Sequence, residues 1–223
     1  MFNLKKFLFS FGLIFCLFSF VPGIFAYEKS VEDLAAKFNI TAEKMDTILT
    51  DGKRKLVPIV SSDRDFYIGL FSNKENEEYM KHYGNGRIMS KKSSNNSFDR
   101  RISRMWNYSK PKSLSFIVKE DGKSVGFVAA GPVDNSSSNP ELGMVVEKNS
   151  SGKGLGNFIV KKLVSVMQEL KNLGIYKYKT LVSTSKPSNF ASRKAVLKAG
   201  FTTSEEIIKT NFGYEKIYKY QFS

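Results

Sequence analysis

Cysteine and histidine are nearly absent from this 223-residue sequence, which contains only Cys16 and His82. Because Cys16 lies in the hydrophobic N-terminal stretch, a chain cleaved after that stretch has no disulfide, no thiol nucleophile and no thiolate metal ligand. A lone histidine also argues against a zinc site or a Ser-His-Asp triad, and we interpret His82 as a surface residue at a helix end. The sequence therefore points away from metal and thiol chemistry.

Acidic residues are also in the minority, since 21 Asp and Glu accompany 35 Lys and Arg and give a net charge of +14. Such a surface attracts anions, but the sequence has no tight basic run with interleaved aromatic residues. We therefore interpret the lysine excess as compositional and expect no specific nucleic-acid partner. Hydrophobic residues make up 41% and charged residues 25%, as in an ordinary globular protein, and the length suits a single domain.

One long hydrophobic run occurs, within residues 1–26. Lys5 and Lys6 precede an uncharged apolar stretch that ends at Ala26, a small residue suited to a cleavage site. This pattern predicts a secretory signal peptide, and because the run is long enough to span a bilayer, an uncleaved membrane anchor is the alternative. Either way the rest of the chain is exported, and membrane contact is expected only through this segment. If translation starts later than Met1, the protein is cytoplasmic.

Residues 27–54 are interpreted as a helical lead-in to the main domain, which spans 55–223. Apolar spacing predicts two short helices between Ser30 and Asp51, with Ser30 and Thr41 as N-caps. A DNA-binding helix-turn-helix is the alternative interpretation. No helix rich in Arg or Asn follows, so we favour a pair of helices that packs on the main domain.

The main domain is predicted to mix strands and helices. A strand is predicted over 55–60, then a helix capped by Ser62, and 91–97 is predicted to be a polar loop before the next helix. The following elements are a hairpin over 114–130, a strand over 141–147, a long amphipathic helix, a strand over 176–183, a helix from Asn189 and a strand pair within 204–220. This order predicts an α+β (mixed α/β) fold in one domain.

The central motif is a glycine-rich turn, Ser151-Gly152-Lys153-Gly154-Leu155-Gly156, between a predicted strand and the long amphipathic helix. Its glycines leave backbone N–H groups unshielded, and the helix adds its own free N–H groups and the positive end of its dipole. Such a turn binds a pyrophosphate, although a turn built only for tight packing is the alternative. The spacing fits neither a dinucleotide-binding fingerprint nor a nucleotide-triphosphatase loop.

Two motifs in the expected order resemble the GNAT superfamily of N-acetyltransferases. Gly154 and Gly156 fill the two small positions of that family's cofactor signature, while Ser151 stands where Arg or Gln is usual. The block that begins Asn189-x-x-Ser192 and ends in Lys-x-Gly-Phe resembles the branch that acetylates protein N-terminal Ser or Ala, a ribosomal-protein acetyltransferase-like group. The resemblance implies a single domain with a central, mostly antiparallel sheet flanked by helices.

The resemblance also implies acetyl-CoA as the acetyl donor, no metal, and an amine-bearing acceptor, either a protein or peptide N-terminus or a small amine. The resemblance also implies Asn189 and Ser192 as catalytic residues beside the cofactor arm, although helix capping also explains Asn189. Glu141 is the candidate base for the amine's proton, with a structural carboxylate at a strand end as the alternative. The cofactor is expected to contact Met144, Val145 and Val146 through its pantetheine arm and Ser151, Gly152, Lys153, Gly154, Leu155, Gly156 and Asn157 through its pyrophosphate.

One expected family residue is missing. Many relatives carry a Tyr four residues before the Gly of the Gly-Phe pair, where it protonates the leaving thiolate, and here Val196 occupies that place. Either another group such as Tyr176, Tyr178 or Tyr218 acts, or the thiolate leaves unassisted. A catalytically weak acyl-CoA-binding or partner-binding relative is therefore the alternative function.

Overall fold

The computed structural model describes residues 30–80, 87–133, 140–210 and 213–222. The predicted export segment, His82 and the tip over 134–139 lie outside the described residues. Within the described ranges, no helix is both long enough and apolar enough to cross a membrane.

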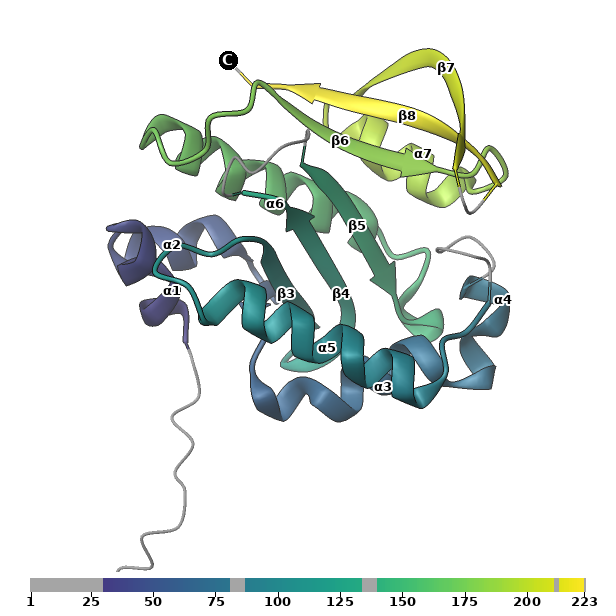
Figure 1. Ribbon diagram of the computed structural model, residues 1–223, viewed down its shortest axis with the longest axis horizontal. Coiled ribbons are helices and arrows are strands. Elements are labelled where there is room, and N and C mark those ends of the chain that lie inside the picture. The colour runs from purple at the N-terminus through teal and green to yellow at the C-terminus, as the bar shows by residue number, and fades with distance from the viewer. Residues whose placement is uncertain (1–29, 81–86, 134–139, 211–212, 223) are drawn as a thin grey trace, which may run out of the picture.

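A single eight-stranded sheet forms the centre of the protein (Figure 1). Its spatial order is β1-β2-β3-β4-β5-β6-β8-β7, and all neighbouring strands are antiparallel except β5 and β6. The strands are β1 (Thr50–Asp51), β2 (Arg54–Pro58), β3 (Leu114–Glu120), β4 (Lys123–Gly131), β5 (Glu141–Val146), β6 (Thr180–Ser185), β7 (Thr202–Thr210) and β8 (Gly213–Gln221). The mostly antiparallel sheet expected from the sequence is confirmed.

Helices cover both faces of this sheet, as Figure 1 shows. One face carries α1 (Val31–Phe38), α2 (Ala42–Leu49), α6 (Leu155–Asn172) and α7 (Phe190–Lys198). The opposite face carries α3 (Arg64–Ser72) and α5 (Lys91–Trp106), with the short α4 (Glu77–Met80) between them in the chain. Three single 3-10 turns complete the elements: Ser61–Asp63, Lys74–Asn76 and Lys148–Ser150.

The two lead-in helices form where the sequence predicts them. Ser30 caps α1 by accepting the Asp33 N–H, and Thr41 caps α2 by accepting the Lys44 N–H. Both helices pack on the domain, because their apolar residues belong to the main core and Lys44 of α2 pairs with Glu169 of α6 at 2.6 Å. The packing interpretation is therefore the one that the structure supports.

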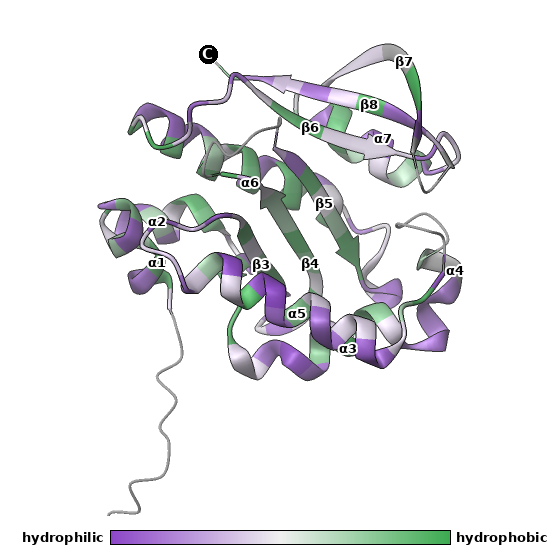
Figure 2. Cartoon of the chain, in the orientation of Figure 1, coloured by the Kyte–Doolittle hydropathy of each residue, from purple (hydrophilic) through white to green (hydrophobic). Residues whose placement is uncertain are grey.

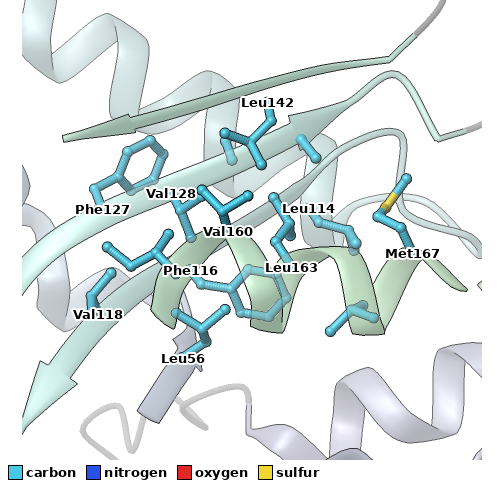
Figure 3. Close-up of a cluster of buried hydrophobic side chains, with 14 of the residues drawn as sticks. Leu56, Leu114, Phe116, Val118, Phe127, Val128, Leu142, Val160, Leu163 and Met167 are labelled. Carbon is cyan, nitrogen blue, oxygen red and sulfur yellow. The ribbon is translucent and has the colours of Figure 1, made fainter. Parts of the chain in front are cut away.

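The core lies between the sheet and α6 (Figure 3). Leu56, Phe116 and Val128 from three strands meet Val160 and Leu163, and all five side chains are fully buried. Figure 2 shows the contrast between α6, which carries many hydrophobic residues, and α5, which is largely hydrophilic. On the α5 face the core is aromatic instead, with the rings of Tyr67, Phe71, Phe98 and Phe127 in tilted and edge-on contacts.

Three boundaries differ from the sequence predictions. The polar segment 91–97 is not a loop: α5 begins at Lys91, because Ser90 accepts the Ser93 N–H and caps it. Ser62 caps no helix, since α3 follows a 3-10 turn in which Asp63 accepts the Val60 N–H at 2.9 Å. Finally, β6 begins at Thr180 rather than at residue 176, because Tyr176 is buried against Phe222 and its hydroxyl donates to the Thr180 carbonyl.

Candidate functional site

The sheet opens between β5 and β6. The two strands share one residue pair, Glu141 with Val182, where the Val182 N–H donates to the Pro140 carbonyl at 2.9 Å. Beyond this pair they diverge, as Figure 1 shows, while β5 stays paired with β4 along its whole length. Beyond Glu141, no strand of the described ranges lies along this backbone edge of β5, and such an edge can pair with an extended ligand.

A cleft of about 1370 Å³ occupies this opening. Every site residue proposed from the sequence lines this cleft except Lys153. The carbonyl of Lys153 instead accepts a hydrogen bond from Arg54, outside the cleft. The charged residues that line it are Arg101, Arg104, Glu141, Lys148, Lys194, Lys198 and Glu215. Of these, only Glu141 was among the proposed site residues.

The residues of β5 face two different sides of this cleft, because side chains alternate along a strand. Met144 lies on the α6 side, since its methyl group is 3.7 Å from the position that a Cβ on Gly156 would take. Val145 lies on the α5 side, because it pairs with Phe127, whose ring contacts Tyr67 of α3 at 5.0 Å. Glu141 has the same parity as Val145 and therefore also faces the α5 side.

The glycine turn forms the α6 side of the cleft. Gly152 and Gly154 have φ values of 80° and 82°, which a residue with a side chain rarely adopts. Gly154 is the N-cap of α6, and no side chain caps the helix there. The first N–H groups of α6 consequently keep their capacity to bind an anion.

Gly156 allows the turn to approach α7 closely. A Cβ at this position would lie 3.1 Å from the Ala195 Cβ, so α6 and α7 would have to separate. Asn189 caps α7 by accepting the Ser192 N–H at 3.1 Å, as expected, and its neighbours Lys194 and Lys198 add positive charge to this end of the cleft. The Oδ1 atom of Asn157 is buried here without a hydrogen-bond partner among the described residues.

Arg54, at the start of β2, holds the turn from outside the cleft. Its Nη2 donates to the Lys153 carbonyl at 2.8 Å, and its Nε donates to Glu120 Oε1 at 2.8 Å. Two anchors fix the guanidinium, so the turn is tied to the sheet through β2 and β3. The sequence alone does not reveal this contact, because no local pattern connects residues 99 positions apart.

Glu141 is held on the α5 side by one strong hydrogen bond. The Thr184 hydroxyl donates to Glu141 Oε1 at 2.6 Å, and the carboxylate is otherwise exposed to the cleft. The bond fixes the carboxylate at the point where β5 and β6 separate. This placement suits a base, and it also satisfies the structural alternative of a carboxylate that ties two strands together.

The tyrosines considered as proton donors do not line the cleft. Burial raises the pKa of the Tyr176 hydroxyl, which donates to the Thr180 carbonyl. The Tyr218 hydroxyl is buried and accepts a hydrogen bond from Arg193 at 2.9 Å, and Val196 is a fully buried core residue. No acid for a leaving thiolate is therefore provided by these side chains.

Comparison with known proteins identifies one family. The family model described as acetyltransferase (GNAT) domain matches residues 54–202. No curated protein matches the chain significantly.

Several solved structures share the fold. The microcin C7 self-immunity acetyltransferase MccE, in complex with acetyl-CoA and AMP, has a TM-score of 0.62 at 20% identity, covering 79% of this chain and 100% of its own. RimL, a ribosomal L7/L12 alpha-N-protein acetyltransferase in complex with coenzyme A, has a TM-score of 0.62 at 14% identity, covering 78% and 97%. The spermidine N-acetyltransferase from Vibrio cholerae, with CoA and spermine, has a TM-score of 0.59 at 13% identity, covering 76% and 94%.

Proposed function

We propose a function that follows from the family, since the chain belongs to the GNAT family of acetyl-CoA-dependent acetyltransferases. It transfers acetyl from acetyl-CoA to a primary amine, either a protein or peptide N-terminus or a small amine. One observation carries the proposal. The glycine turn of α6, the free edge of β5 and the carboxylate of Glu141 all open into one cleft.

The residues on the α6 side fit acetyl-CoA. The uncapped start of α6 and the backbone of residues 151–157 suit its pyrophosphate, and Lys194 and Lys198 add complementary charge. The orphaned Oδ1 of Asn157 can accept a hydrogen bond from the ligand. The free edge at Met144, Val145 and Val146 suits an extended amide-bearing arm. Acetyl-CoA supplies the acetyl group as a thioester that an amine can attack.

Glu141 prepares the amine on the α5 side. An amine can attack only when it is neutral, whereas at neutral pH most amines carry a proton. The Glu141 carboxylate accepts this proton, and Thr184 keeps one of its oxygens in place. Backbone N–H groups of the free β5 edge stabilise the negative charge that develops on the acetyl oxygen. The new C–N bond replaces the C–S bond of the thioester, and coenzyme A leaves as the thiolate, which solvent can protonate. Positioning of the two substrates provides the remaining acceleration.

The names of the structural neighbours support an amine acceptor. They include an alpha-N-protein acetyltransferase and a spermidine N-acetyltransferase, whose named substrates both carry amines. We also propose that residues 1–26 export the protein, as their charge and hydropathy pattern predicts.

Binding of acetyl-CoA to the full chain tests the first step. A matched pair of variants, Gly152→Asp and Gly152→Asn, adds nearly the same shape where nothing lies within 4 Å of a Cβ. Both substitutions impose the same unfavourable φ, which Asn and Asp tolerate best. Only Asp adds a negative charge beside the pyrophosphate, so we expect calorimetry to show about 10- to 100-fold weaker binding for Asp than for Asn. Equal affinities would mean that the turn is only structural.

Transfer is then measured on a panel of N-terminal peptides, polyamines and lysine peptides, with mass spectrometry of the products. Acetylation of any amine by a chain that binds acetyl-CoA supports the proposed function. Binding without transfer to any of them would instead favour a catalytically weak acyl-CoA-binding relative.

A further inference from the structure

The α5 side of the cleft carries unpaired charges of both signs. Arg101 and Arg104 approach it from α5, and Glu215 approaches it from β8. Among the described residues, no ion pair or side-chain hydrogen bond joins any of these three to a partner. Other arginines of the chain do form ion pairs: Arg54 pairs with Glu120, and Arg64 pairs with Asp99.

Glu215 shares a face of the sheet with the candidate base. Thr184, which donates a hydrogen bond to Glu141, pairs with Ile217 of β8. Glu215 precedes Ile217 by two residues in β8 and therefore lies on the same face of the sheet. The opposite face of β8 carries Tyr218, whose hydroxyl accepts a hydrogen bond from Arg193 of α7. The register therefore directs Glu215 to the α5 side, and the cleft joins it with Glu141.

Glu215 is a mostly buried residue whose carboxylate opens into the cleft without a partner among the described residues. Only 8% of the residue is exposed, yet it lines the cleft. Its carboxylate opens into the cleft, where the described protein atoms provide neither a cation nor a hydrogen-bond donor for it. A ligand ammonium at this place supplies both the charge and the donors.

Arg101 and Arg104 are suited to an oxyanion. They lie three residues apart in α5 and therefore project from neighbouring positions on one helix. Arg101 lies over the Phe127 ring at 5.7 Å, which leaves the edge of its guanidinium free for hydrogen bonds. A guanidinium binds carboxylate and phosphate oxygens through two parallel hydrogen bonds.

We infer that the acceptor is zwitterionic: its amine lies beside Glu141 and Glu215, and its carboxylate or phosphate group is bound by Arg101 and Arg104. The inference rests on the proposed function and adds a substrate class to it. A purely cationic amine would meet two unpaired guanidinium groups, whereas a pure anion would meet two carboxylates, so each leaves one pair of charges uncompensated.

Acceptor pairs that differ only in the anionic group test the inference. The carboxylate pair is an amidated peptide with Asp or Asn after its N-terminal residue, and the phosphate pair is phosphoethanolamine and ethanolamine. Spermidine is the polycationic comparison. With acetyl-CoA saturating and the full chain as enzyme, we expect kcat/KM to be at least tenfold higher for the anionic member of one pair or both. The pair that shows the preference identifies the anion as carboxylate or phosphate.

The variants Arg101→Gln and Arg104→Gln should remove this preference by raising KM for the anionic acceptor about tenfold, while the neutral acceptor is unaffected. Arg100→Gln is the matched control, because Arg100 is exposed on the same helix and does not line the cleft. Glu215→Gln should raise KM for every amine, with the affinity for acetyl-CoA unchanged.

Acceptor binding to the CoA-saturated chain, measured by calorimetry, gives the same comparison without turnover. If spermidine or the neutral amines are used or bound as well as the zwitterions, or if Arg101→Gln and Arg104→Gln match Arg100→Gln, the inference is wrong while the acetyltransferase function stands. Failure of the chain to bind acetyl-CoA would instead remove the proposed function.

Discussion

Arg54 should control the affinity for acetyl-CoA without touching it. We expect the variant Arg54→Gln to release the glycine turn, because the residue's Nη2 donates to the Lys153 carbonyl and its Nε to Glu120, both at 2.8 Å. The side chains of Arg54 and Glu120 are 24% and 13% exposed, so water competes only in part for these bonds.

The expected loss follows from those two bonds. A hydrogen bond to a charged group contributes about 1.5–3 kcal/mol when buried, and partial exposure reduces the loss for the two bonds together to roughly 1–2 kcal/mol. For a protein of this size, the loss lowers the melting temperature by about 2–8 °C. Binding of acetyl-CoA must then restore the order of the turn. If this ordering accounts for half or more of the lost free energy, the Kd for acetyl-CoA rises by about 2- to 30-fold.

Lys53→Gln is the matched control, because it removes the same charge from the neighbouring residue. Its pair with Asp121 spans 3.3 Å between side chains that are 60% and 63% exposed, and such pairs contribute little. Thermal unfolding and calorimetry with acetyl-CoA are the assays, and the KM for the acceptor should stay constant. A folded Arg54→Gln variant with unchanged acetyl-CoA affinity, or an equal loss in Lys53→Gln, would show that Arg54 does not control cofactor binding.

Three further predictions concern other parts of the chain. Glu141→Gln should lower kcat by roughly a hundredfold, most strongly on the acidic side of the pH profile, while acetyl-CoA affinity stays the same; full turnover at every pH would make Glu141 structural. Burial raises the pKa of Tyr176 above its ordinary value of 10.0, so the neutral hydroxyl stabilises the fold fully below pH 10 and that stability is lost as the pH rises further. Tyr176→Phe should flatten this alkaline decline in urea unfolding while it lowers stability near pH 7 by about 1 kcal/mol, because the bond to Thr180 is lost. Residues 1–30 fused to a reporter active only outside the cytoplasm should give signal, whereas a silent cytosolic fusion would favour a later start codon.

Local signals predicted much of the fold. The caps at Ser30 and Thr41, the turn at Asp121-Gly122 and the glycine turn each depend on a few consecutive residues, and each forms where expected. The start of α5 was missed because residues 91–97 are polar and show no helical period. Only the cap at Ser90 and the burial of Ser94 and Phe98 reveal the helix, and burial becomes visible only in the tertiary structure.

Local motifs indicated some of the cleft residues. Glu141 belongs to β5, and Asn189 and Ser192 belong to the start of α7, and the structure brings all three into a single cleft. Arg54, Arg101 and Glu215 were missed for a different reason. Arg54 reaches the glycine turn from β2, whereas Arg101 and Glu215 reach the cleft from α5 and β8. These contacts depend on strand register and on the position of α5 over the sheet.

On the proposed function, the alternation of β5 makes the contacts to acetyl-CoA and to the acceptor separately adjustable. The even-numbered residues of β5, which include Met144, face the α6 side. The odd-numbered residues, Glu141, Gly143 and Val145, face the α5 side. A substitution at Gly143 or Val145 changes the side chain on the α5 side and keeps the backbone edge that we propose for acetyl-CoA. It can therefore alter which acceptor is used, which is useful for engineering a new selectivity. An insertion of one residue within β5 would have the opposite effect, because it would exchange the two sets of side chains and disable both half-sites at once.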